Sequence, residues 1–173
     1  MIKIDTMDLK DLPQIKDLVY RSFLNEPHSD HTEQDFVEHL VHTENFVPQL
    51  ALIAKKDNKI VGFLMLYPIG FKGAGTLKAL GLAPLSVDPA FQKQGIGSAL
   101  LREAHRRAKR AYDVITLVGH PGYYPRFGYE QASKYHVAFP FDLPEEVKMI
   151  KLLHEKTELL GNYKIEYPIG YFA

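Results

Sequence analysis

One short stretch combines glycines with polar side chains where a strand gives way to a helix. It comprises Gln92, Lys93, Gln94, Gly95, Ile96, Gly97 and Ser98. The first-turn N–H groups of a helix have no partner within the helix, and the helix dipole favours an anion beside them. Glycine lets the backbone approach a phosphate closely, while Lys93 adds positive charge and Ser98 adds a hydroxyl. The stretch is therefore predicted to bind phosphate groups of a ligand.

Two common nucleotide-binding motifs do not fit this loop. A Walker A loop requires Gly-x-x-x-x-Gly-Lys-Ser/Thr, which the chain lacks. A dinucleotide-binding fingerprint requires a third glycine, and Leu100 stands at that position. Glycines in a strand-to-helix turn are also often purely geometric, so the loop alone does not identify the ligand.

The loop and a segment downstream resemble the GNAT superfamily of acetyltransferases. The superfamily signature, Gln/Arg-x-x-Gly-x-Gly/Ala, lies between its fourth strand and third helix, and Gln92, Gly95 and Gly97 match it. Downstream, residues 123–129, Tyr-Tyr-Pro-Arg-Phe-Gly-Tyr, resemble the Phe-Tyr-x-x-x-Gly-Phe segment of the same proteins. Two matches in this order and spacing are more specific than either alone.

Two longer stretches, residues 119–128 and 167–172, resemble the YhbS-like branch of that superfamily. The resemblance covers most of the chain and is weakest over residues 24–48. In GNAT proteins the corresponding stretch helps to line the acceptor pocket. The resemblance therefore describes the cofactor site better than the acceptor site.

The resemblance implies one domain, residues 1–173, with a mixed α/β fold of the GNAT type. Its central sheet is expected to contain antiparallel and parallel strands, to splay between the fourth and fifth strands, and to carry helices on both faces. The cofactor core would span about residues 50–130, and the C-terminal strands and extension would span residues 131–173.

Hydrophobic spacing predicts the elements that position these residues. Asp11 is expected to cap the first helix. The strand is expected to be broken, bulged or unpaired at Pro84, because proline cannot donate to a sheet ladder. Strands are expected at residues 2–5, 50–54, 60–67, 77–87 and 114–118, helices from residues 12, 34 and 96, and a turn or short helix at residues 121–127.

Acetyl-CoA is the cofactor that the resemblance implies. Its pantetheine arm is expected to pair with main-chain groups of Leu85, Ser86 and Val87, and its pyrophosphate to lie on the N–H groups of residues 93–98. An amine would then attack the thioester directly in a ternary complex, so the protein would be an N-acetyltransferase. The chain has no cysteine, which agrees with a mechanism that needs no acyl-enzyme.

Tyr124 matches the tyrosine that serves many family members as the acid near the sulfur. The strand at residues 77–87 contains no acid, although many members carry a catalytic glutamate there. A water chain, His120 or Glu33 is left as the base. The connection after the fifth strand also lacks the asparagine that bonds to the cofactor in many members.

The charge composition limits the kinds of partner that the protein is expected to bind. Twenty-one basic and 21 acidic residues give a formal net charge of zero, so nucleic acid is not expected as a partner. Acidic side chains around the expected acceptor pocket would attract a cationic amine, either a small molecule or a peptide. These residues are Glu26, Asp30, Glu33 and Asp35.

Other interpretations of the chain's polar residues are less favoured. The histidines and acids of residues 28–33 are better explained by a surface loop than by a metal site, and no metal is expected. No apolar run is long enough for a membrane span or a signal peptide, so we expect a cytoplasmic protein without membrane contact. The oligomeric state, a homodimer included, stays open.

A non-catalytic acyl-CoA-binding or sensing module of the same fold is the alternative function. The missing acid of the fourth strand favours this alternative, whereas Tyr124 favours the enzyme.

Overall fold

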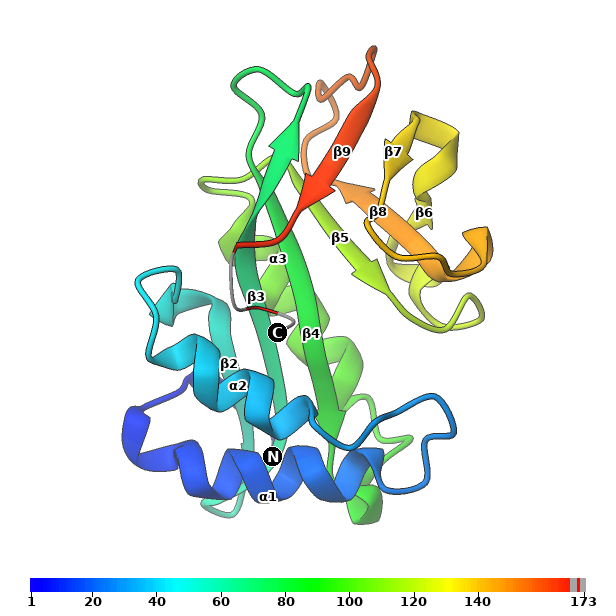
Figure 1. Ribbon diagram of the computed structural model, residues 1–173. Coiled ribbons are helices and arrows are strands. Elements are labelled where there is room, and N and C mark those ends of the chain that lie inside the picture. The colour runs from blue at the N-terminus through cyan, green and yellow to red at the C-terminus, as the bar shows by residue number, and fades with distance from the viewer. Residues whose placement is uncertain (169–170, 172–173) are drawn as a thin grey trace. The chain divides into compact units, whose positions relative to one another are not determined.

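The computed structural model describes residues 1–168 and 171, and its elements are shown in Figure 1. The chain packs into two compact units. The first unit comprises Met1–Tyr67 with Ala83–Arg107, and the second comprises Pro68–Leu82 with the described residues from Ala108 onward. Residues 169, 170 and 172 of the segment that resembles the YhbS-like branch lie outside the described part. That the chain acts as one domain stays a prediction.

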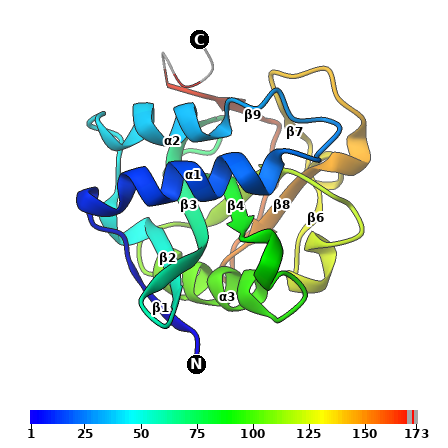
Figure 2. The ribbon, with the colours of Figure 1, turned by 90° about the horizontal axis from the view of Figure 1, so that it is seen from below.

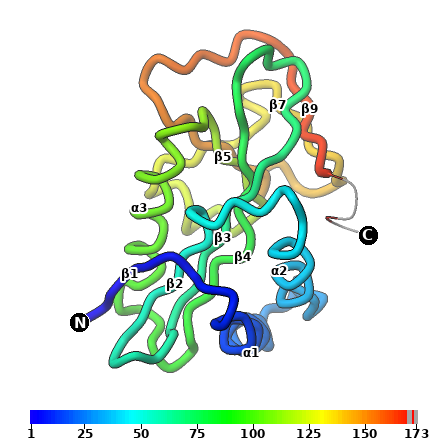
Figure 3. Tube along the Cα trace, turned by 90° about the vertical axis from the view of Figure 1, so that its left-hand side faces the viewer, coloured from blue at the N-terminus to red at the C-terminus, as the bar shows by residue number. Residues whose placement is uncertain are grey.

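The first unit is a sheet covered by helices on both faces. Strands β1, β2 and the start of β3 pair antiparallel, with Lys3 opposite Lys55 and Ala51 opposite Met65. Helices α1 and α2 cover one face and α3 covers the other (Figures 2 and 3). The main elements are β1 (Lys3–Thr6), α1 (Leu12–Phe23), α2 (Glu33–Val41), β2 (Ala51–Lys56), β3 (Lys59–Lys72), β4 (Ala79–Val87) and α3 (Ile96–Ala108), with 3-10 turns η1 (Leu9–Asp11), η2 (Pro48–Leu50) and η3 (Pro89–Phe91).

The second unit combines parallel and antiparallel pairs. Strand β5 pairs parallel with the start of β4 and antiparallel with β8, which also pairs with β6. Strand β9 pairs antiparallel with the end of β3 and parallel with β7. The elements are β5 (Val114–Val118), η4 (Tyr124–Phe127), β6 (Glu130–Gln131), η5 (Ala132–Tyr135), β7 (Val137–Ala138), η6 (Glu145–Val147), β8 (Lys148–Leu152) and β9 (Tyr163–Glu166).

The mixed sheet of the predicted GNAT fold is confirmed, and its key pairing is short. The β4–β5 ladder joins Ala79–Gly81 to Val114–Thr116 and ends there, although β4 continues to Val87. Beyond Gly81 the two strands are no longer paired, as the expected splay between them requires. Of the three outcomes expected at Pro84, the structure has the unpaired one on the β5 side: β4 runs on through a cis Ala83–Pro84 bond, but its ladder with β5 has already ended at Gly81.

The helices form where the apolar spacing predicts them. On α1 the residues Leu12, Ile15, Leu18 and Val19 are buried, which is one face at helical spacing. The predicted cap is wrong in detail. Asp11 makes no side-chain capping bond to α1; instead its carboxylate accepts from the Asp8 N–H at 3.0 Å, in a capping box around η1. Pro13 near the start of α1 needs no capping acceptor, because proline has no backbone N–H.

Helix α3 lies close against the sheet at Gly62 of β3. The apolar face of α3 is buried as predicted, through Ile96, Leu100, Ala104 and Ala108. A Cβ atom at position 62 would lie 2.9 Å from Ile96 Cγ2, 3.0 Å from Leu100 Cδ1 and 3.2 Å from Ala54 Cβ. The glycine therefore sets how near the start of α3, which follows the glycine loop, can approach the strand.

We expect Gly62→Ala to destabilise the protein by about 1–3 kcal/mol, because an extra methyl group overpacks a filled core. Thermal denaturation would show a fall of several degrees in the melting temperature. Gly122→Ala is the matched control, since a Cβ there meets no atom within 4 Å. Equal melting temperatures for the two variants would contradict this account of the α3 contact.

Candidate active site

The glycine loop forms the start of α3, as predicted. The Gly95 carbonyl accepts the first helical hydrogen bond, from the Ala99 N–H at 3.0 Å. The N–H groups of residues 95–98 therefore have no acceptor within the helix. Gly95 has φ +82° and a Cβ there would meet no atom within 4 Å, so the loop is open on that side. Lys93 is also left-handed, with φ +63°, and is exposed.

The predicted cofactor residues before the loop lie along the end of β4. Leu85 and Val87 are half-buried, whereas Ser86 is 1% exposed on the opposite face of the strand. The Ser86 hydroxyl has no hydrogen-bond partner among the described residues. Gln92 Nε2 donates to the Val87 carbonyl at 3.2 Å, which ties the loop back to the end of β4. That structural role for Gln92 was not part of the prediction.

Asp88, which the sequence analysis missed, holds the junction between β4 and the loop. The residue is 3% exposed, and its carboxylate accepts from the Ala90 N–H at 2.9 Å. It also accepts from Arg21 of α1 at 3.1 Å and lies 3.7 Å from Lys59 Nζ of β3. Burial alone would raise the pKa of Asp88, but the Ala90 N–H, Arg21 and Lys59 together lower it below the ordinary value.

Tyr124 opens η4 in the second unit, in the turn predicted at residues 121–127. The His120 carbonyl accepts from the Tyr123 and Tyr124 N–H groups at 3.1 and 3.4 Å. The Tyr124 ring meets Tyr123 edge-on with centroids 5.1 Å apart, and Tyr129 at 5.7 Å. Burial raises the pKa of Tyr124 above the ordinary phenol value, with a smaller contribution from Tyr123.

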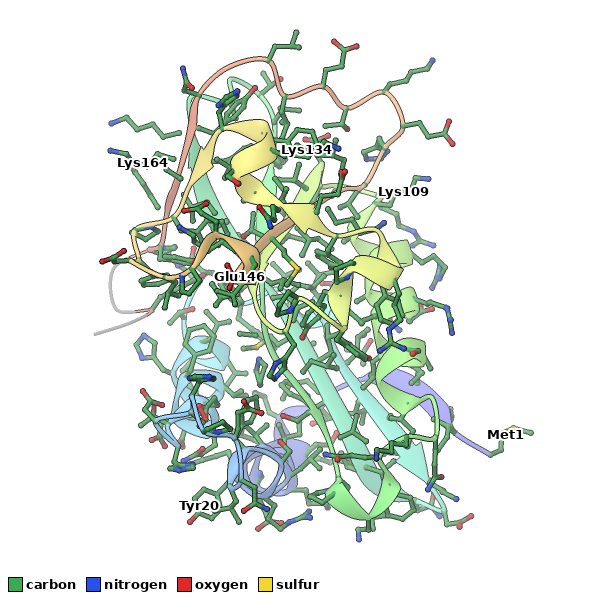
Figure 4. All side chains as sticks on the ribbon, turned by 90° about the vertical axis from the view of Figure 1, so that its right-hand side faces the viewer. Met1, Tyr20, Lys109, Lys134, Glu146 and Lys164 are labelled. Atoms are coloured by element: carbon green, nitrogen blue, oxygen red, sulfur yellow. The ribbon has the colours of Figure 1, made fainter. Side chains whose placement is uncertain are left out.

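The other predicted catalytic residue, His120, is exposed, and its main-chain carbonyl organises the turn. Across that turn, Lys151 of β8 lies against Gly128, where a Cβ would be 2.6 Å from Lys151 Nζ. Burial and the nearby charge of Lys109, which lies just beyond α3 (Figure 4), lower the pKa of Lys151. No local sequence signal pointed to Lys151, because it lies 23 residues beyond Gly128 in the chain.

The predicted acceptor residues Glu26 and Glu33 lie in the first unit, in the α1–α2 connection and the first turn of α2. Both are half-buried. The Ser29 hydroxyl donates to the Glu33 carboxylate, at 2.8 Å from Oε2, so this acid also stabilises the connection itself. Contact with an acceptor stays a prediction for both residues.

Within residues 1–168 and 171, no group of three or more histidine, aspartate or glutamate side chains could hold a metal ion. None of the described helices is both long and apolar enough to cross a bilayer.

Comparison with known proteins defines the class. A model of the acetyltransferase (GNAT) domain matches residues 48–131. The Escherichia coli protein named uncharacterized N-acetyltransferase YjhQ is 32% identical over 154 residues, which is 87% of this chain and 82% of that protein. The chain therefore belongs to the GNAT family of N-acetyltransferases.

Within that family the chain is similar to YhbS, as the sequence analysis expected. The E. coli protein named uncharacterized N-acetyltransferase YhbS is 32% identical over 127 residues, 71% of this chain and 70% of that protein. A crystal structure of YhbS in complex with CoA has a TM-score of 0.84 and 26% identity, covering 96% of this chain and 89% of that one. A GNAT acetyltransferase from Brucella melitensis in complex with acetyl-CoA has the same fold, with a TM-score of 0.79, 23% identity and coverage of 98% and 97%.

The ion pair between Asp88 and Arg21 contributes to stability in a way that depends on pH. A carboxylate whose folded pKa is depressed stabilises the fold above the pKa of about 4 that it has unfolded, and this stabilisation is lost as the pH falls through the folded value. Asp88→Asn should therefore cost about 1–3 kcal/mol at pH 7 and progressively less below pH 4. Chemical denaturation at several pH values would measure the difference.

Asp142→Asn serves as the control for Asp88→Asn, because Asp142 is exposed. A stability loss in Asp88→Asn that stays constant from pH 7 to pH 3 would argue against the ion-pair contribution.

Proposed function

We propose that this protein transfers the acetyl group of acetyl-CoA to an amine acceptor, by direct attack of the amine on the thioester in a ternary complex. The observation that carries the proposal is the open, glycine-capped start of α3 in a member of this family. The related YhbS and Brucella structures were solved with CoA and acetyl-CoA, which supports the same cofactor for this chain.

The cofactor site proposed here uses main-chain groups. The pyrophosphate lies at the N–H groups of residues 93–98, where the α3 dipole and Lys93 favour negative charge. The pantetheine amides pair with main-chain groups of Leu85, Ser86 and Val87. The end of the β4–β5 ladder at Gly81 supports this role, because the later part of β4 is not paired with β5.

A cationic acceptor must first lose one proton to the solvent, because only the free amine can attack the thioester. The transfer itself then requires two further proton movements. Tyr124 donates its phenolic proton to the thiolate sulfur as the carbon–sulfur bond breaks, and solvent then restores the proton. A base accepts the proton that the amine loses, and His120, Glu33 and a water chain are the candidates. A tyrosine phenol is protonated at neutral pH, as an acid must be before transfer.

The acceptor proposed is a cationic amine, either a small molecule or a peptide. Glu26, Asp30, Glu33 and Asp35 concentrate negative charge in the α1–α2 connection and the start of α2. The test incubates the protein with acetyl-CoA and a panel of amines and follows the release of free thiol. Acetyl-CoA binding without thiol release for any amine would favour the non-catalytic acyl-CoA-binding module instead.

Gly97→Val tests the cofactor site. A branched side chain in the first turn of α3 should block the approach of the pyrophosphate and weaken acetyl-CoA binding at least tenfold, a loss of about 1.4 kcal/mol. Titration calorimetry measures the affinity. Arg106→Val places the same side chain on an exposed part of α3 beyond the loop and should bind normally. Undiminished binding by Gly97→Val would refute this cofactor site.

Tyr124→Phe tests the acid. The substitution keeps the ring and removes the hydroxyl, so turnover should fall by roughly a hundredfold while the Michaelis constant for acetyl-CoA changes little. Tyr123→Phe is the matched control, because its ring faces Arg126 at 4.7 Å and stands perpendicular to the Tyr124 ring. A loss in Tyr123→Phe alone would move the acid to position 123, and a loss in neither would favour proton delivery by water.

A further inference from the structure

Gly119 directly follows β5, and the Tyr124 ring packs against its Cα atom. A Cβ atom at this position would lie 2.5 Å from Tyr124 Cε2, 3.0 Å from Tyr124 Cδ2 and 3.2 Å from Leu117 Cδ1. Carbon atoms in ordinary contact are about 3.5–4.0 Å apart, so the ring occupies the volume that any side chain here would need. The position excludes a side chain for steric reasons alone.

The Gly119 backbone cannot easily move aside. Its N–H donates to the Val147 carbonyl at 3.0 Å, which ties the end of β5 to the turn before β8. The neighbouring residues of β5 are paired with β8 along the whole strand, from Val114 opposite Leu152 to Val118 opposite Lys148. An added methyl group would therefore displace the tyrosine and not the strand.

The Tyr124 ring is also confined on its other sides. Tyr129, which is 2% exposed, meets it at a centroid distance of 5.7 Å and an interplanar angle of 74°. Tyr123 stands perpendicular to it at 5.1 Å. The η4 backbone is closed by the bond from the Gly128 N–H to the Pro125 carbonyl at 3.0 Å. With these neighbours in place, the contact with Gly119 fixes how closely the ring can approach the end of β5, and hence the position of the hydroxyl.

We propose that Gly119 is a positioning residue for acetyl transfer: its lack of a side chain holds the Tyr124 hydroxyl where it can reach the leaving sulfur. The inference rests on the proposed role of Tyr124 as the acid. An effective proton donor must come within about 2.6–3.2 Å of its acceptor, and a misplacement of about 1 Å costs on the order of a hundredfold in rate. A Cβ at position 119 would lie about 1 Å closer to the Tyr124 ring than ordinary carbon–carbon contact allows, so the ring would have to move by about that distance.

The test compares Gly119→Ala, Tyr124→Phe and the double variant in steady-state kinetics. Gly119→Ala should lower turnover ten- to a hundredfold and leave the Michaelis constant for acetyl-CoA unchanged. In the Tyr124→Phe background the same substitution should cost little more, because the hydroxyl that it misplaces is already gone. Gly122→Ala, in the same turn with open space around it, should keep full turnover.

A stability measurement keeps the inference testable if Gly119→Ala folds poorly. Tyr124→Ala removes the ring that the new methyl group would meet, so the double variant Gly119→Ala/Tyr124→Ala should be at least as stable as Tyr124→Ala alone. A double variant that loses the full stability cost of both single changes would overturn the proposed contact.

The kinetic outcomes separate this inference from the function on which it rests. Normal turnover in Gly119→Ala together with a large loss in Tyr124→Phe would overturn the positioning role alone. A Gly119→Ala loss that multiplies fully with the Tyr124→Phe loss would overturn it as well. Full activity in Tyr124→Phe would overturn the acid assignment, and the positioning role with it.

Discussion

The hydrogen bonds of a buried carboxylate directly after β4 are the interactions on which the glycine loop before α3 depends. Asp88 has its N–H bound to the Val61 carbonyl at 2.8 Å and its side chain bound to Ala90 and Arg21. It thus joins a helix, two strands and a 3-10 turn at one residue. A buried charge is costly unless it is hydrogen-bonded, so these partners must be present together. The loop that follows begins from a fixed point for that reason.

The proposed pyrophosphate site and the proposed acid depend on different physical effects. At the start of α3 the chain offers main-chain N–H groups and a helix dipole, which stabilise negative charge without a buried cation. At Tyr124 it offers a phenol, which is protonated at neutral pH without a charged partner and whose pKa burial raises further. Both devices come from the backbone path and packing, which suits a chain whose formal charges cancel.

Local signals made much of the fold and part of the site predictable. The helix that starts at Ile96, the helix from Leu12 and the strand 114–118 follow from apolar spacing within one element, and the structure has each of them. The tyrosine turn was predictable from its proline and glycine. Pro84 also signalled where β4 is no longer paired, because proline cannot donate to a ladder and the β5 ladder ends at Gly81, before the proline.

The contacts that no local pattern encodes were the ones missed. Arg21 and Asp88 are 67 residues apart, and Arg107 of α3 donates to Thr6 of β1 across 101 residues at 2.7 Å. A glycine such as Gly119 gives no sign in sequence that an aromatic ring covers it. Long-range pairing and steric exclusion are properties of the folded chain, and residue type alone does not carry them.

The length of β3 has a consequence for how such a protein can change. Residues 59–65 of this strand pair with β2, while Gly70–Lys72 pair with β9 in the other unit. Side chains alternate between faces along a strand, so one inserted or deleted residue between these segments would turn one set of side chains to the wrong face. The number of residues between the two paired segments of β3 is therefore fixed. Connections such as the one between α1 and α2 tolerate inserted or deleted residues better, because they lie outside the sheet.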